Sequence, residues 1–201
     1  MAEIVALVDY GAGNLHSVQN ALKAAGADRI AVTADPVSIR DADRIVLPGV
    51  GAFAAAMRAL EAAPGLVEAL NDTVIAKGRP FLGVCVGMQL MAEAGEEHGT
   101  TPGLGWVQGV VRAIPADGVK VPHMGWNDVR PTVPNPLIEA GEAYFLHSFA
   151  YQGSDVIAET EHGGRIAAAI GRDNMVGVQF HPEKSQRYGL ALLARFLEWR
   201  P

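Results

Sequence analysis

Short apolar runs rich in β-branched residues alternate with helical segments through the first half of the chain. The apolar runs lie at 3–9, 29–32, 44–49 and 79–85, and the helical segments lie at 14–27, 53–60 and 66–77. Strands that alternate with helices in this way build a parallel sheet with helices on both faces. The pattern therefore predicts an α/β fold with a doubly wound, mostly parallel sheet.

The second half has a different texture after about Gly95. Shorter strand-like runs follow one another, and the sequences "HGG" and "GRDN" between them are typical of hairpin turns. We therefore expect antiparallel strands added to the parallel sheet, with an amphipathic helix at 188–199 closing the chain. No repeat, low-complexity segment or linker divides the sequence, which predicts a single domain over residues 1–201.

Composition narrows the class of protein. A hydrophobic share of 49 % and a charged share of 19 % are typical of a well-packed globular chain. The net charge of −6 argues against a nucleic-acid partner, because phosphate backbones attract basic surfaces. No apolar run approaches the roughly 18 residues of a membrane span, and the start lacks a signal-peptide pattern. With a single cysteine, no internal disulfide is possible, and we expect a cytoplasmic protein.

That single cysteine, Cys85, lies between Gly83 and Gly87 where a predicted strand meets a predicted helix, "MQLMAEA". This is the thiol counterpart of the Gly-x-Ser-x-Gly nucleophile elbow, a sharp strand-to-helix turn that presents a nucleophile. A helix N-terminus also favours the thiolate. Free cysteines are, however, often simply buried, so the pattern by itself leaves a reactive and a packed cysteine equally open.

A reactive Cys85, unlike a packed one, needs a general base such as a histidine close to the thiol. Of the six histidines, His181 follows the strand-like "MVGVQF" and precedes Glu183 by two residues. In extended backbone such a pair points the same way, so Glu183 could orient His181 while the other ring nitrogen faces the thiol. A surface turn would look similar, but in combination with the elbow a catalytic pair is favoured. His98 and His162 are interpreted as solvated surface residues, and His16 lies on the first helix.

A third component follows the strand at 44–49. Gly51 can turn its N–H group toward a cavity without a Cβ clash, so Gly51 and Val86 are candidate backbone donors to an oxyanion. The alternative is an ordinary tight turn that enters a helix. Gly49 and Gly51 also fit the start of a dinucleotide-binding motif, which requires an acidic residue at the end of the next strand, about 20 positions later. That position falls in a predicted helix, so a dinucleotide site is disfavoured. No Walker loop or zinc motif is present, so we expect no cofactor and no metal.

Together these pieces resemble the class I, triad-type glutamine amidotransferases. The resemblance is carried in order from Val8 to Ser185 by "VDYGAGNLHSV", "LPGVGAF", "CVGMQLM", "HMGWN", "YFLHSF" and "GVQFHPEKS". It implies that Cys85 attacks the amide of glutamine, that His181 transfers the proton and that Glu183 holds His181. It also implies glutamine contacts from Gln89 and from the backbone of His147, Ser148 and Phe149.

The resemblance further implies a partner. Ammonia loses its nucleophilicity when it is protonated in bulk water, and members of this family pass it directly to an acceptor. Here the implied acceptor is a (β/α)₈ cyclase subunit in a heterodimer. The implied docking residues are Asn14, His123, Trp126, Tyr144 and Lys184.

Three other functions stay open at this point. The chain could be the glutaminase of another amidotransferase, such as pyridoxal phosphate synthase, although "HMGWN" and "VDYGAGN" argue against it. It could be a cysteine hydrolase that uses the same elbow on another substrate. It could also be a silent binding subunit, which the intact Cys85, His181 and Glu183 disfavour.

Overall fold

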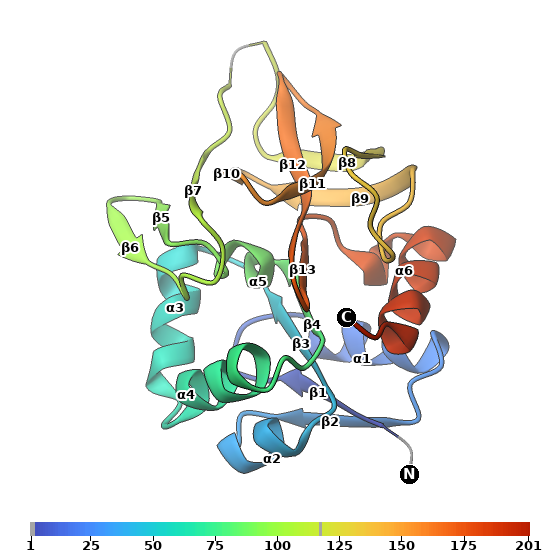
Figure 1. Ribbon diagram of the computed structural model, residues 1–201. Coiled ribbons are helices and arrows are strands. Elements are labelled where there is room, and N and C mark those ends of the chain that lie inside the picture. The colour runs from blue at the N-terminus through green and yellow to red at the C-terminus, as the bar shows by residue number, and fades with distance from the viewer. Residues whose placement is uncertain (1–2, 117) are drawn as a thin grey trace.

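The computed structural model describes residues 3–116 and 118–201, which form a nine-stranded sheet and a four-stranded sheet (Figure 1). One half of the large sheet is parallel, because β1 pairs with β2 and β3, and β4 pairs with β3 and β13. Its strands, in spatial order, are β2 (Arg29–Thr33), β1 (Ile4–Val8), β3 (Arg44–Gly49), β4 (Phe81–Cys85) and β13 (Met175–Val178). The α/β expectation is confirmed.

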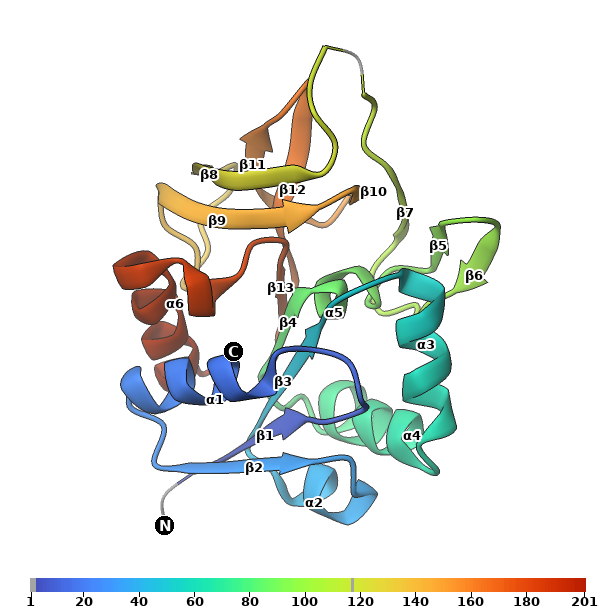
Figure 2. The ribbon, with the colours of Figure 1, turned by 180° about the vertical axis from the view of Figure 1, so that it is seen from behind.

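The other half of the large sheet is antiparallel. It continues from β13 through β12 (Arg165–Arg172), β11 (Val156–Glu161), β8 (His123–Pro131) and β9 (Gly141–His147). The predicted turns are confirmed, since "GRDN" joins β12 to β13 and "HGG" joins β11 to β12. β8 and β9 extend the sheet at the end away from α2 (Figure 2). The small sheet consists of β10 (Phe149–Gly153), β7 (Gly109–Ala113), β5 (Ala94–Glu96) and β6 (Thr100–Pro102).

Helices cover both faces of the parallel strands, with α1 and α6 on one side and α3 and α4 on the other (Figures 1 and 2). The helices are α1 (Leu15–Ala24), α2 (Pro36–Asp41), α3 (Phe53–Ala62), α4 (Leu66–Leu70), α5 (Val86–Gln89) and α6 (Gln186–Glu198), with a π-helical turn at Asn71–Ala76 after α4. Every residue of β3, β4 and β13 is buried, as expected for strands covered on both faces. None of the described helices is both long and apolar enough to span a membrane.

Local sequence explains where two of these helices begin. Asn14 caps α1 as predicted, because its side chain accepts a hydrogen bond from the Ser17 N–H at 3.3 Å. The sequence prediction omitted α2, although Asp35 caps it in the same way and Pro36 occupies its first turn. That Asp-Pro pair was a usable signal.

The predicted helix after Cys85 is much shorter than expected. It ends at Gln89, although "MQLMAEA" would allow a longer helix. The carbonyl oxygens of Leu90, Met91 and Ala92 instead accept hydrogen bonds from N–H groups between Leu104 and Val107. Because a crossing segment uses those carbonyls, helical hydrogen bonds stop there, and the chain continues into β5.

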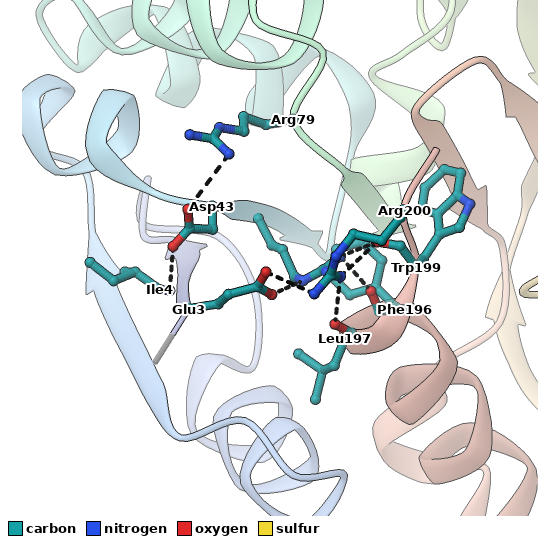
Figure 3. A network of polar contacts seen from close by, with 9 residues as sticks. Glu3, Ile4, Asp43, Arg79, Phe196, Leu197, Trp199 and Arg200 are labelled. Atoms are coloured by element: carbon teal, nitrogen blue, oxygen red, sulfur yellow. Dashed lines mark hydrogen bonds and ion pairs between the residues drawn. The ribbon is translucent and has the colours of Figure 1, made fainter. Parts of the chain in front are cut away.

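A buried arginine joins the sheet to the C-terminal helix. Arg44 is 1 % exposed; its Nε donates to Glu3 at 2.9 Å, and its Nη1 donates to the carbonyl oxygens of Phe196 at 2.8 Å and Trp199 at 2.9 Å. Glu3 also accepts from Arg200 at 2.8 Å, and both side chains lie beside the end of α6 (Figure 3). These contacts satisfy carbonyls that the end of a helix leaves without partners.

We expect Arg44→Met to lower the free energy of unfolding by roughly 2–4 kcal/mol, because Glu3 and the carbonyl oxygens of Phe196 and Trp199 each lose the buried guanidinium as one of their donors. The matched control is Arg200→Met, which removes a second guanidinium from Glu3. The Arg200 side chain is 62 % exposed, and its loss should cost less than about 1 kcal/mol. Urea unfolding measures both variants, and equal losses would contradict the structural role given to Arg44.

Candidate active site

Cys85 lies at the junction of β4 and α5 in a strained backbone conformation, with φ of 54° and ψ of −111°. The flanking glycines make the turn possible. A Cβ on Gly87 would overlap the carbonyl oxygen of Leu47, and one on Gly83 would lie 2.7 Å from the carbonyl oxygen of Gly87. The sharp turn thus depends on close backbone packing. Because α5 has only four residues, its helix dipole adds little stabilisation to a thiolate at Cys85. The free backbone N–H groups at the start of α5 are then the main polar groups beside the sulfur.

His181 and Glu183 meet the cysteine from the other end of the chain. β13 runs parallel to β4, with Val178 opposite Val84, so the residues after both strands come to the same edge of the sheet. His181 Nδ1 lies 2.8 Å from Glu183 Oε1. Cys85 lines the same cavity as His181 and raises the pKa of His181, so the sulfur lies close to the imidazole. The thiol, the imidazole and the carboxylate therefore lie in sequence, with the His181–Glu183 pair joined by a hydrogen bond.

The expected reason for the His181–Glu183 contact was wrong. His181 itself is extended, but Pro182–Lys184 forms a 3₁₀ turn, so His181 and Glu183 do not belong to one extended stretch. Tertiary contacts hold the histidine instead: its N–H donates to the Tyr144 carbonyl at 2.9 Å, and its carbonyl accepts from the Ser185 hydroxyl at 2.7 Å. The turn, anchored to β9, brings the carboxylate back to the ring.

The environment of His181 favours its charged form. Burial lowers the pKa of His181, but hydrogen bonds to Cys85 and Glu183 and the negative charge near them outweigh burial and raise that pKa to about 9. At neutral pH the imidazole is therefore protonated. An imidazolium beside sulfur pairs well with a thiolate nucleophile.

The sulfur and the imidazole face one cavity of about 150 Å³. All six predicted glutamine-site and oxyanion residues line it as well. The cavity lining is Val50, Gly51, Cys85, Val86, Gln89, Glu97, Leu146, His147, Ser148, Phe149, His181 and Lys184. Gly51 has φ of 91° and no atom that would contact a Cβ, while Val86 is the first residue of α5. Within the described ranges, no three His, Cys, Asp or Glu side chains group as a metal site requires.

Two buried glutamines, Gln179 and Gln89, connect Cys85 to the backbone of Phe149 through hydrogen bonds. Gln179 Nε2 donates to Cys85 Sγ at 3.7 Å, and its Oε1 accepts from Gln89 Nε2 at 3.0 Å. Gln89 Nε2 also donates to the Phe149 carbonyl at 3.0 Å. The predicted Gln89 is thus tied to the protein as well as lining the cavity. Sequence reasoning missed Gln179, and its position two residues before His181 was the only local signal.

Glu97 is a second residue that was missed. Glu97 directly precedes His98 and lines the cavity, and its Oε2 accepts from the Phe53 N–H at 2.8 Å. This carboxylate therefore caps α3, the helix that follows the Gly49–Gly51 turn. A carboxylate at the rim of the cavity also suits a positively charged group on a ligand.

The predicted docking residues differ in accessibility. Trp126 is 48 % exposed and packs edge-on to Tyr144, and Lys184 lies 5.9 Å above the Tyr144 ring. Asn14 is exposed at the start of α1, whereas His123 is only 4 % exposed and points inward.

Met124 on β8 and Leu146 on β9 point outward, to the side opposite His123. We name the surface formed by Met124, Trp126, Tyr144, Leu146 and Lys184 the β8–β9 outer face. It adjoins the cavity, because Leu146 and Lys184 belong to both.

The chain matches one protein-family model and several named relatives over nearly its whole length. The family described as "Glutamine amidotransferase class-I" matches residues 6–199. A Zymomonas mobilis protein named imidazole glycerol phosphate synthase subunit HisH is 60 % identical, covering 98 % of this chain and 96 % of its own. The Brucella abortus protein of the same name is 52 % identical, with 98 % and 99 % covered.

Solved structures show the same fold at low identity. A structure titled "Crystal structure of glutamine amidotransferase" superposes with a TM-score of 0.73 at 17 % identity, covering 96 % of this chain and 97 % of that chain. The Thermotoga maritima PurLQS structure gives a TM-score of 0.67 at 20 % identity, with 98 % and 99 % covered. These two similarities support the fold.

Proposed function

The chain belongs to the class-I glutamine amidotransferase family, and on that premise we propose that it is the glutaminase subunit of an imidazole glycerol phosphate synthase. It hydrolyses glutamine to glutamate and ammonia. The ammonia passes to a (β/α)₈ cyclase subunit that converts PRFAR to imidazole glycerol phosphate and AICAR in histidine biosynthesis. The observation that carries the glutaminase role is that Cys85 and His181 face one cavity while Glu183 holds the His181 ring through a 2.8 Å contact.

The first half of the reaction forms a thioester. The Cys85 thiolate adds to the side-chain amide carbon of glutamine, and the carbonyl oxygen becomes an oxyanion. The N–H groups of Gly51 and Val86 are the proposed donors to that oxyanion, a contribution typically worth roughly 100- to 1000-fold in rate per donor. The imidazolium of His181 gives its proton to the amide nitrogen, the C–N bond breaks, and ammonia leaves.

The second half releases glutamate. His181, now neutral, takes a proton from water as the water oxygen adds to the thioester carbon. The C–S bond then breaks, which restores the thiolate and the imidazolium. Glu183 keeps the imidazole oriented and stabilises its charge through the 2.8 Å contact with Nδ1. Gln89 and the backbone of residues 147–149 are the proposed contacts to the bound glutamine.

The partner is proposed to dock on the β8–β9 outer face. Large apolar side chains are exposed there, including Met124 at 62 % and Trp126 at 48 %. Because Leu146 and Lys184 also line the cavity, a subunit on this face would cover its mouth and receive ammonia without release to bulk water. Asn14 is assigned to the same heterodimer interface. We further assign residues 1–201 to one glutaminase domain in the cytoplasm, where a reducing medium preserves the thiol.

Co-purification with a candidate cyclase, followed by assays with glutamine and with ammonia, tests this function. We expect the lone chain to release little glutamate and the complex to release it rapidly while PRFAR is consumed. Fast glutamine hydrolysis by the isolated chain would contradict the dependence on a partner. Glutamate release that responds to a pyridoxal phosphate synthase subunit, and not to the cyclase, would contradict the assigned pathway.

A further inference from the structure

Two buried histidines face each other across β8 and β9 beside the candidate active site. His123 and His147 are directly opposed in the strand register, and His123 Nδ1 lies 3.0 Å from His147 Nε2. His147 Nδ1 lies 2.9 Å from the Phe149 carbonyl oxygen, and Asn127 Nδ2 lies 3.1 Å from His123 Nε2. The three side chains therefore form a series that ends on the backbone of the cavity lining.

The donors and acceptors of this series follow from its two ends. Asn127 Oδ1 accepts from the Asp128 N–H at 2.9 Å, and Nδ2 donates to the Glu161 carbonyl at 2.9 Å, so the orientation of the amide is determined. Nδ2 must then donate to His123 Nε2, which leaves the proton of His123 on Nδ1. The Nδ1–H of His123 therefore donates to His147 Nε2, and the Nδ1–H of His147 donates to the Phe149 carbonyl.

Burial agrees with this assignment of neutral rings. Burial lowers the pKa of His123 to about 4, with a smaller contribution from His162. It also lowers the pKa of His147 to about 4, against the opposing effect of the bond to Phe149. The ring of His123 is held between two others, Phe145 at 4.7 Å and His162 at 4.2 Å between centroids. The prediction that His162 is simply a solvated surface residue is corrected here.

The series continues to the nucleophile. The Phe149 carbonyl accepts from Gln89 as well as from His147, Gln89 also donates to Gln179, and Gln179 donates to the sulfur of Cys85. A fixed hydrogen-bond path thus runs from the inner side of β8 to the reacting atom. On the same strand, Met124 and Trp126 point the opposite way, onto the β8–β9 outer face.

We propose that His123 and Asn127 are positioning residues for glutamine hydrolysis, acting through the His147 tautomer and the Phe149 carbonyl from directly behind the β8–β9 outer face. Neither residue lines the cavity, so neither touches the substrate. The inference rests on the proposed function, because glutamine binding by residues 147–149 is itself part of that proposal. Its physical basis is that a neutral His147 with Nδ1 protonated is the one form that can donate to Phe149 while accepting from His123.

The test compares His123→Phe with His123→Asn in the complex with saturating cyclase. Phenylalanine keeps a flat ring between Phe145 and His162 but has no donor for His147. Asparagine loses the ring but can place an amide N–H near the position of Nδ1. We expect His123→Phe to raise the KM for glutamine at least about tenfold with a smaller change in kcat, and His123→Asn to recover most of that loss. Ammonia-dependent synthesis by the same preparations should stay within twofold.

A folded His123→Phe variant with an unchanged glutamine KM would overturn the proposal, as would a phenylalanine variant no worse than the asparagine variant. A second measurement does not depend on the reaction. NMR of nitrogen-labelled histidine in the wild-type chain at neutral pH should show His123 and His147 neutral and protonated on Nδ1. The opposite tautomer of either ring would overturn the series even if the variant failed to fold. Failure of the proposed function would appear separately, as wild-type complex without glutamate release.

Discussion

Cys85→Ala is expected to abolish glutamine-dependent synthesis by the complex and to leave ammonia-dependent synthesis intact. Without the sulfur, no thioester can form, and the remaining groups can only polarise the amide. Losing the nucleophile of a triad costs roughly 10⁶-fold in kcat in a comparable hydrolase, so we expect a loss of at least about 10⁴-fold. The measurement is glutamate release and product formation, with glutamine or ammonium salt as the nitrogen source.

The buried position of Cys85 makes alanine a mild structural change. The thiol is 3 % exposed, and its removal leaves a space of about one atom beside Gln179. An unchanged ammonia-dependent rate therefore serves as the internal control for folding and docking. Equal loss of both activities would contradict the role of nucleophile, because that result would indicate a damaged complex instead of a missing sulfur.

Glu183→Gln is expected to reduce kcat/KM for glutamine by roughly 10³- to 10⁴-fold, the size typical for the orienting carboxylate of a triad. Glutamine has nearly the same shape, so the loss isolates the charge. In the wild type, burial lowers the pKa of His181 while hydrogen bonds to Cys85 and Glu183 raise it to about 9. Removing the negative charge destabilises the imidazolium, so the pKa of His181 must fall.

The pH profile checks the sign of that change. Wild-type activity should decline as the pH rises through about 9, where His181 loses its proton. In Glu183→Gln the decline should begin at lower pH. Glu61→Gln, at an exposed position of α3, is the matched control and should leave the profile unchanged. A variant profile that coincides with that of the wild type would contradict the assignment of Glu183.

Much of the fold was predictable because its signals are local. The strands at 29–33 and 44–49 and the helix from Leu15 to Ala24 follow from apolar periodicity and from the Asn14 cap. Local reasoning failed where another segment supplied the hydrogen bonds. α5 stops at Gln89 because residues 104–107 donate to the next carbonyls, and no pattern within "MQLMAEA" announces that crossing.

The candidate site was predictable only in part for a related reason. Cys85 with its two glycines is a compact pattern whose geometry depends on neighbours in sequence, so it was visible at once. His181 was found as a candidate base, but its link to Glu183 was given the wrong backbone geometry. Gln179 and Glu97 carry no distinctive spacing. They became site residues only when folding placed them against Cys85 and the cavity.

The sequence by itself determined which segments become strands and helices and where a nucleophile could stand, since backbone sterics, capping and burial periodicity act over a few residues. Only the tertiary structure decided which of these segments and side chains lie next to one another. After a long antiparallel excursion through β8 to β12, the chain inserts β13 beside β4, and that strand order brings His181 to Cys85. It also turns His123 inward and Trp126 outward on one strand. Strand order depends on the packing of whole faces, and short-range periodicity contains no information about it.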